Sequence, residues 1–184
     1  MVKQWRFVGF DDGFSGFTSK NACIVGCVTA GTYVEGFLYE RIEVDGFDVS
    51  EKIISMINDS KFREQIRCIF LPGITFAGMN IADIQEIHRN TGIPVVVVMK
   101  KLPDFDGMER AISRTENPDE RRRILEKAGE IKPLFSLFVQ LAGCSEEDAK
   151  NYIRASTLKG NTPECLRIAH LVASAIVYGE SRKA

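Results

Sequence analysis

Apolar and polar residues follow two different patterns along this chain. Three early runs are rich in β-branched and aromatic residues and are joined by short links: 4–10, 21–30 and 33–44. Such composition is typical of β-strands, and the short links indicate antiparallel hairpins. After these runs, helical spacing alternates with short apolar stretches. The pattern therefore predicts three hairpin strands followed by strand–helix units.

The second part of the chain contains the predicted helices. Asp48 and Glu51 have the spacing of a capping box before a helix over 49–57. Another helix is predicted to start at Asn80, with Asp83 in its first turn, and to end near Gly92. Three more helices and three strands complete the prediction: helices from residue 118, over 145–156 and over 162–178, and strands over 68–71, 93–99 and 134–141.

The order of these elements indicates an α/β fold. The stretch "IPVVVVM", residues 93–99, is apolar without alternation, which is typical of a parallel strand covered on both faces. We therefore expect a mixed sheet of three antiparallel strands followed by parallel strands, with helices on both faces. The order β-β-β-α-β-α-β-α is that of the ribonuclease H-like fold. No linker interrupts the pattern, so one domain over residues 1–184 is expected.

Composition and charge narrow the class of protein. The formal charge is −1, so binding to a nucleic acid would require a local basic patch. The five cysteines are odd in number and lie mostly in apolar runs, which predicts free thiols in a reducing compartment. No signal peptide or membrane span is evident, so we expect a cytoplasmic protein without membrane contact. The sequence leaves the oligomeric state open.

The stretch "RFVGFDDGFSGF", residues 6–17, ends an apolar strand on two adjacent acids, Asp11 and Asp12. Aspartate and glycine are common in β-turns, so a turn is one interpretation. The other is a site for Mg²⁺ or Mn²⁺ at the sheet edge, where the cation would activate water against a phosphodiester. The neighbouring strand should supply a second acid, but Pro72 stands there, and proline cannot ligate a metal.

The third strand adds further acids. A period of two places Glu40 on the face of Leu38 and Ile42, and Glu43 and Asp45 on the other face. The other interpretation is an edge or solvent-facing strand with a turn at Asp45 and Gly46, and we favour it for Glu35 and Glu43. The candidate metal ligands are Asp11, Glu40, Glu43 and Asp45, and the candidate catalytic residues are Asp11, Asp12, Glu40 and Asp45.

The loop "GITFAGMN" leads to the same sheet edge and offers free N–H groups to a phosphate. The substrate-binding candidates are Gly73, Thr75, Gly78, Asn80 and Asp83. Acids surround the basic run at 121–123, which therefore predicts a solvated helix face. The chain lacks the G-x-x-x-x-G-K-[ST] and G-x-S-x-G motifs, so P-loop and serine-hydrolase chemistry are not expected.

Several segments together resemble a known family. "RFVGFDDGFSGF", "FLPGITFAGMNIADI", "TGIPVVVVMKK" and "TPECLRIAHLVASA" are similar to the archaeal uncharacterised family catalogued as domain of unknown function 99. More distantly they resemble endonuclease V, a ribonuclease H-like nuclease, whose wedge motif and C-terminal helix are similar to "TYVEGFLYER" and "PECLRIAH". This resemblance implies that Asp11 occupies the position of the first metal-binding aspartate.

The chain also departs from that family. The family's D-G falls on Pro72 and Gly73, and its strand-three glutamate falls near Ile42. Two interpretations remain. One is a Mg²⁺- or Mn²⁺-dependent nucleic-acid hydrolase with a weakened active site, for which we expect weak metal binding. The alternative is a non-catalytic module that binds nucleic acid or protein on the same scaffold.

Overall fold

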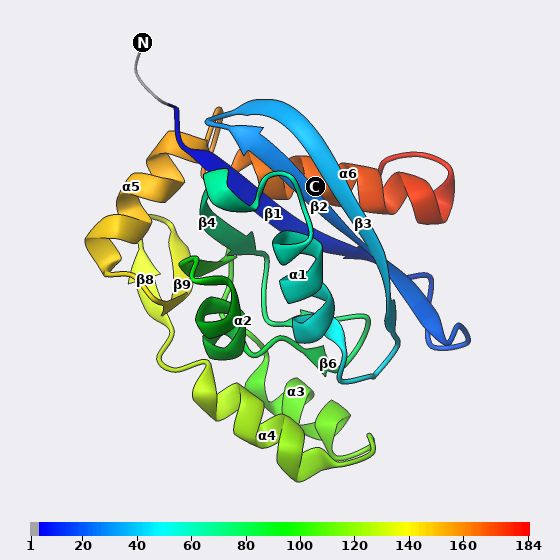
Figure 1. Ribbon diagram of the computed structural model, residues 1–184. Coiled ribbons are helices and arrows are strands. Elements are labelled where there is room, and N and C mark those ends of the chain that lie inside the picture. Colours follow the sequence, from blue (N-terminus) through cyan, green and yellow to red (C-terminus); the bar gives the residue numbers. More distant parts are fainter. Residues whose placement is uncertain (1–3) are drawn as a thin grey trace.

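The computed structural model describes residues 4–184, whose core is a seven-stranded mixed sheet (Figure 1). The strand order is β3-β2-β1-β4-β7-β9-β8. The strands of this sheet are β1 (Arg6–Gly13), β2 (Asn21–Ala30), β3 (Tyr33–Glu43), β4 (Ile66–Leu71), β7 (Val95–Met99), β8 (Lys132–Leu134) and β9 (Leu137–Ala142). A separate small hairpin is formed by β5 (Thr75–Phe76) and β6 (Asn80–Ile81).

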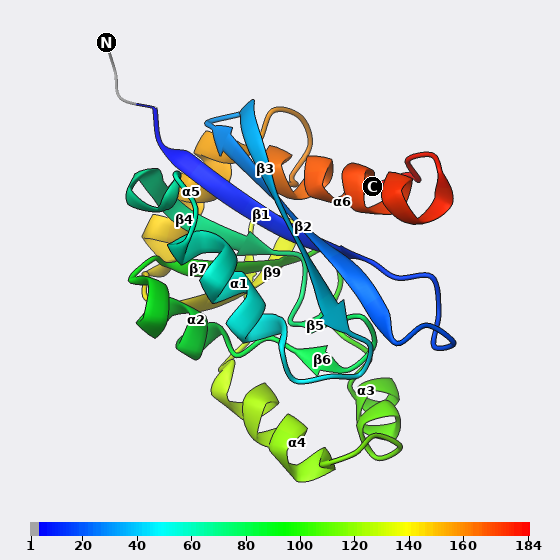
Figure 2. The ribbon, with the colours of Figure 1, turned by 45° about the vertical axis from the view of Figure 1, so that its right-hand side comes forward.

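Helices cover both faces of the sheet (Figures 1 and 2). One face carries α1 (Val49–Asn58) and α2 (Ile84–Thr91), and the other carries α5 (Glu146–Ser156) and α6 (Glu164–Tyr178). The remaining helices are α3 (Phe105–Ile112) and α4 (Pro118–Lys127), which lie beyond one end of the strands, and a 3-10 turn, η1 (Arg63–Gln65). The predicted fold class is therefore confirmed.

The side chains of β1 alternate between the two layers of the core. Val8 and Phe10 pack with α1 and α2, whereas Phe7 packs with α5 and α6. This alternation follows from the period of two in a strand. Because Asp11 and Asp12 continue the strand, their carboxylates lie on opposite faces of the sheet.

The structure corrects the predicted end of the first strand. Strand β1 runs to Gly13, and Asp11, Asp12 and Gly13 pair with Val25, Ile24 and Cys23 of β2. The β-turn interpretation of the two acids is therefore wrong. The buried strand β2 supplies the ladder partners, and this pairing outweighs the turn propensity of the local sequence.

The structure also corrects the second half of the sheet. Strand β7 is fully buried and parallel to β4, as "IPVVVVM" predicted. The single strand predicted over 134–141 is instead the hairpin β8–β9, and β9 runs antiparallel to β7. Phe135, with a positive φ of 56°, lies in the turn of this hairpin. A non-glycine turn of this kind carries little signal in the sequence.

Two helix starts differ from their predictions. Asp48 precedes α1, but its carboxylate accepts from Glu43 N and from Asn80 Nδ2, so the predicted capping box does not form. Asn80 lies in β6, and α2 begins four residues later with Asp83 as its N-cap, which accepts from Glu86 N. Both corrections have one cause, because the 74–82 segment folds as a hairpin docked against α1.

The helical region between β7 and β8 contains two further differences. Helix α3 was not predicted, since its short apolar pattern is interrupted by Gly107. The basic run at 121–123 is not wholly solvated, because the side chain of Arg121 is buried at 1% exposure. Only Arg122 and Arg123 remain outside the core.

The cysteine prediction is confirmed within the described residues. All five cysteines are free thiols, and all except Cys144 are buried. In the part of the chain from residue 4 onward, none of the helices is long and apolar enough to cross a membrane.

Candidate active site

Helix α6 packs directly on the backbone of β1. A Cβ atom on Gly9 would lie 2.6 Å from the backbone nitrogen of Leu166, and one on Gly13 would lie 2.7 Å from the carbonyl oxygen of Ala173. Side chains at either position would push the helix away from the strand. The two glycines therefore bring the residues in the middle of α6 within reach of Asp11, which lies between them.

The residue brought into reach is His170. One helical turn from Leu166 to His170 rises about 6 Å, close to the advance of two strand residues from Gly9 to Asp11. His170 Nδ1 lies 2.9 Å from Asp11 Oδ2, while Asp11 Oδ1 accepts from Asp12 N at 2.9 Å. The second ring nitrogen of His170 lies 3.2 Å from the carbonyl oxygen of Lys183. Asp11 and His170 thus form an ordered pair.

Burial raises the pKa values of the two adjacent aspartates, Asp11 and Asp12. The side chain of Asp11 is 15% exposed, and burial, followed by the charge of Asp12, raises the pKa of Asp11 to about 6. The bond to His170 acts in the opposite direction but is smaller. Burial also raises the pKa of Asp12, whose Oδ2 accepts from Ala77 N at 2.9 Å on the other face of the sheet.

The raised pKa of Asp11 predicts an inverse dependence of stability on pH. Between the unfolded value of about 3.9 and the folded value of about 6, the folded state binds more protons, so the free energy of unfolding falls as pH rises. We expect the free energy of unfolding to fall by up to about 2–3 kcal/mol between about pH 4 and about pH 7. Urea titrations across this range measure it.

Asp11→Asn tests the assignment of this effect to one residue. The variant should flatten the pH dependence of the free energy of unfolding, because asparagine does not titrate. An undiminished slope in the variant would assign the effect to other acids, Asp12 first among them.

A groove of about 850 Å³ opens over the Asp11–His170 pair, at the carboxyl ends of β1, β4 and β7. We call it the strand-end groove. Most of its charged residues are cations, namely Lys100, Lys159, Arg167 and Lys183. Arg167 is partly neutralised by its bonds to Glu164, whereas the three lysines are exposed. The groove is thus a local basic patch on a chain whose formal charge is −1.

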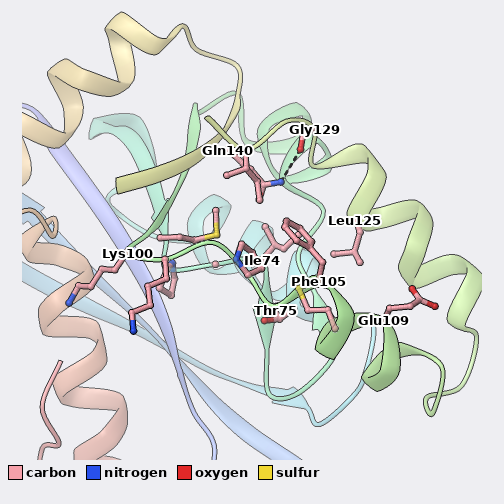
Figure 3. Close-up of a pocket in the computed structure, with 15 residues that line it drawn as sticks. Ile74, Thr75, Lys100, Phe105, Glu109, Leu125, Gly129 and Gln140 are labelled. Atoms are coloured by element: carbon pink, nitrogen blue, oxygen red, sulfur yellow. Dashed lines mark hydrogen bonds between the residues drawn. The ribbon is translucent and has the colours of Figure 1, made fainter. Parts of the chain in front are cut away.

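A second cavity of about 650 Å³ adjoins the groove, and we call it the side cavity (Figure 3). Pro72 and Lys100 line both spaces. The side cavity lies on the α4 side of the sheet, and its wall is largely apolar: Ile74, Met99, Pro103, Phe105, Met108, Leu125 and Ile131. Its polar side chains include Thr75 and Gln140. The size and lining are those of a small-molecule site.

The acids predicted on strand three lie away from the Asp11–His170 pair. Glu40 pairs with Ile24, which pairs with Asp12, so Glu40 lies two strands from β1, roughly 10 Å, on the face opposite Asp11. Glu43 is exposed. The Oδ1 atom of Asp45 accepts from Met79 N and so holds the 74–82 segment.

The predicted substrate-binding residues separate into two groups. Gly73 and Thr75 line the side cavity. Gly78 packs against Asp45 with a positive φ of 83°, and Asn80 is buried, with its amide donating to Glu43 O. Asp83 is also buried, and it forms the α2 N-cap and an ion pair with Lys127. The second group holds the loop in place and does not line either space.

The protein donors for a metal are few. Within residues 4–184, no three His, Cys, Asp or Glu side chains lie close enough to hold a metal ion together. Asp11 offers a carboxylate, whereas both ring nitrogens of His170 already form hydrogen bonds, one with Asp11 Oδ2 and one with the carbonyl oxygen of Lys183. Pro72 lines the groove beside them. Mg²⁺ commonly uses one or two carboxylates and completes its shell with water and phosphate oxygens. Asp11, oriented by His170, fits such a cation, held weakly.

Sequence reasoning missed three residues of this site: His170, Lys100 and Arg167. The chain has only two histidines, so their number gave no signal of a site. The segment "PECLRIAH", which resembles the C-terminal helix of endonuclease V, could have pointed to His170, because His170 is its last residue. Lys100 follows β7 directly, and residues after parallel strands gather at one edge of a sheet.

The fold is that of the endonuclease V structures, which is ribonuclease H-like. The endonuclease V of Ciona intestinalis, in complex with a 23mer DNA containing an inosine followed by a ribo-adenosine, superposes with a TM-score of 0.63 at 14% identity. The match covers 97% of this chain and 88% of that one. At this identity the likeness concerns the fold.

The chain belongs to the endonuclease dU family, whose model matches residues 3–177. A UPF0215 protein of Archaeoglobus fulgidus is 53% identical over 181 residues, which are 98% of each chain. The crystal structure of a protein of unknown function from the same species superposes with a TM-score of 0.90 at 52% identity, covering 96% of this chain and all of that one. The resemblance to endonuclease V is therefore confirmed in the fold.

Proposed function

We propose that this protein is a divalent-metal-dependent endonuclease that cleaves DNA at or near deoxyuridine. The observation that carries the proposal is the Asp11–His170 pair, 2.9 Å apart, on the floor of a basic groove. The groove suits a phosphate backbone, because the lysines supply the charge that neutralises phosphates. The family description, endonuclease dU, supports the choice of lesion.

Asp11 is the residue that would hold the cation, and His170 would orient its carboxylate. A bound Mg²⁺ or Mn²⁺ supplies a water of lowered pKa and neutralises charge on the phosphate under attack. Lys100 stands between the groove and the side cavity, so its ammonium group contacts the backbone of a nucleotide that spans both. Leu166 and Val98 form an apolar wall that limits the water near the pair.

The side cavity would receive the base. An enzyme that acts on a particular nucleotide in DNA takes the base out of the stack and encloses it in a pocket. Here the pocket and the groove share Pro72 and Lys100, so a base in one places its phosphate in the other. Phe105, 60% exposed at the cavity wall, offers an aromatic surface for stacking.

Pro72 favours a second candidate, a non-catalytic module that binds nucleic acid. A proline stands at the end of β4, directly beside Asp11, where a second carboxylate would be needed to hold the cation. The basic groove and the side cavity would still bind DNA without hydrolysing it. The two candidates differ only in cleavage, so one assay separates them.

The assay uses labelled DNA with one central deoxyuridine and a matched strand with thymidine. With Mn²⁺ or Mg²⁺ we expect slow cleavage of the deoxyuridine strand, and none with a chelator. Binding of the deoxyuridine strand without cleavage in either metal would favour the non-catalytic module. The absence of both binding and cleavage would contradict both candidates.

Replacing Pro72 with aspartate should strengthen metal binding. The new carboxylate adds an oxygen ligand beside Asp11 and His170, and hard cations bind more tightly as carboxylates are added. We expect at least a tenfold lower Kd for Mn²⁺, which corresponds to about 1.4 kcal/mol. Isothermal titration calorimetry measures it.

Pro72→Asn is the matched control, because it removes the proline without adding a charge. It should change the Kd for Mn²⁺ far less than Pro72→Asp does. Equal affinities in the two variants and the wild type would mean that the end of β4 does not face the metal position.

A further inference from the structure

Gln140 is a buried polar residue on an otherwise apolar strand. It lies on β9 opposite Val97 of β7, is 5% exposed, and lines the side cavity. In Figure 3 its amide lies beside Gly129 at one end of the cavity, with Thr75 toward the other end. A buried amide costs stability unless it is bonded, so its presence here calls for a partner.

The protein itself supplies one hydrogen-bond partner for the Gln140 amide. Gln140 Nε2 donates to the carbonyl oxygen of Gly129 at 3.0 Å. This bond fixes the orientation of the amide, because a carbonyl oxygen can only accept and the flipped amide would present its own oxygen instead. Within residues 4–184, the Gln140 side chain has no other hydrogen bond. Its Oε1 atom and second Nε2 hydrogen are therefore available to a ligand.

We propose that Gln140 determines which base the side cavity accepts. This inference rests on the proposed function. The free edge of the amide presents an acceptor next to a donor. Uracil presents the complementary edge, since its N3–H donates to Oε1 and its O4 accepts from Nε2–H. Hypoxanthine has the same adjacent N–H and C=O, so the edge is that of deaminated bases.

The fixed amide also excludes the parent bases. Cytosine has an acceptor at N3 and a donor at N4, the reverse of uracil, and adenine has the same reversed order. A base in the position that uracil takes could pair in this reversed order only after a flip of the amide, which would break the bond to Gly129. Thymine shares the edge of uracil, so its exclusion depends on its C5 methyl group and not on Gln140.

The test measures binding with a chelator present, so that no cleavage occurs. Single-stranded oligonucleotides carry uracil, cytosine or N3-methyluracil at one position, and fluorescence anisotropy gives each Kd. We expect the wild type to bind uracil about 10- to 100-fold more tightly than cytosine, the range of one bidentate contact. N3-methyluracil should bind as weakly as cytosine, because it has lost the N3–H donor.

Gln140→Met should lose most of the uracil preference, because methionine has a similar length and neither donates nor accepts strongly. Gln65→Met is the matched control, since it makes the same change at an exposed position that lines neither space and should keep the preference. Circular dichroism checks that each variant folds. If Gln140→Met does not fold, the N3-methyluracil comparison decides the question in the wild type.

The outcomes separate this inference from the proposed function. A wild type that does not prefer uracil over cytosine would contradict the deoxyuridine specificity itself. A wild type that prefers uracil but binds N3-methyluracil equally well would overturn the role of Gln140 alone. The same conclusion would follow if Gln140→Met kept the full preference.

Discussion

Asp11→Asn is expected to abolish metal-dependent cleavage while leaving the protein folded. Asparagine keeps one oxygen beside His170 but loses the negative charge that holds a cation. Because a bound cation contributes several kcal/mol to the transition state, we expect a fall in rate of about 100-fold or more. A cleavage assay in Mn²⁺ measures it, with Mn²⁺ affinity as a second readout.

The same variant should be more stable than the wild type at neutral pH without metal. Burial disfavours the charged form of Asp11, so removing the charge relieves that cost by about 1–3 kcal/mol. A residue that served only the fold would lower stability when changed. Combined loss of activity and gain of stability is typical of a functional site.

Glu43→Gln is the matched control for Asp11→Asn. Glu43 is an exposed acid on β3, away from the groove, and its loss should change neither cleavage nor Mn²⁺ affinity. Equal loss of activity in both variants would indicate a general effect of charge. Unchanged activity in Asp11→Asn would remove the Asp11–His170 pair from the proposed mechanism.

Arg121→Met is expected to cause the largest loss of stability. The buried guanidinium donates to the carbonyl oxygens of Asp45, Gly46 and Met79, and it stacks on Phe47 with 4.0 Å between the guanidinium carbon and the ring centroid. Methionine fills similar space but leaves three carbonyl acceptors, one of them in a fully buried bond, without this donor. We expect a loss of about 3–5 kcal/mol in the free energy of unfolding.

The two loops that Arg121 joins are strained. Asp45 and Ala77 have positive φ values of 53° and 44°, a conformation that non-glycine residues adopt at a cost of about 1–3 kcal/mol each. The bonds of Arg121 help to offset this cost, and any relaxation of the loops after its loss would reduce the loss of stability. Urea unfolding followed by fluorescence measures the effect.

Arg122→Met is the matched control on the same helix. Arg122 pairs with Glu109 and Asp119 at the surface, where such pairs contribute about 1 kcal/mol or less. The control should therefore lose much less stability than Arg121→Met. Similar losses in the two variants would mean that the three carbonyl bonds contribute little.

Much of the fold was determined by local patterns in the sequence. The three early strands were identified because of their β-branched and aromatic composition, and "IPVVVVM" because its unbroken apolar run marks a strand buried on both faces. The hairpin β8–β9 and helix α3 were missed because their turns and interruptions depend on packing. Asn117 and Pro118 marked the start of α4 correctly, since proline is favoured in the first turn.

The candidate site was only partly determined by the sequence. Asp11 was recognised because it ends a core strand, and Pro72 was recognised as a missing ligand. The length of β1 decided which side of the sheet each acid faces. The strand continues past its predicted end at residue 10, so Asp11 and Asp12 belong to it and point to opposite sides of the sheet. That length depends on pairing with β2, which local sequence does not show.

The tertiary structure alone decided which distant residues meet. His170 lies 159 positions from Asp11 along the chain, and Gln140 binds Gly129 across the end of a helix. The buried role of Arg121 depends on carbonyl groups 75 and 76 residues away. The sequence by itself determined most of the strands, most of the helices and one aspartate. The close packing of α6 on the glycines of β1 brought His170 to Asp11, and the packing of α4 on two loops buried Arg121. Such contacts join surfaces that are distant in the sequence, so no local pattern predicts them.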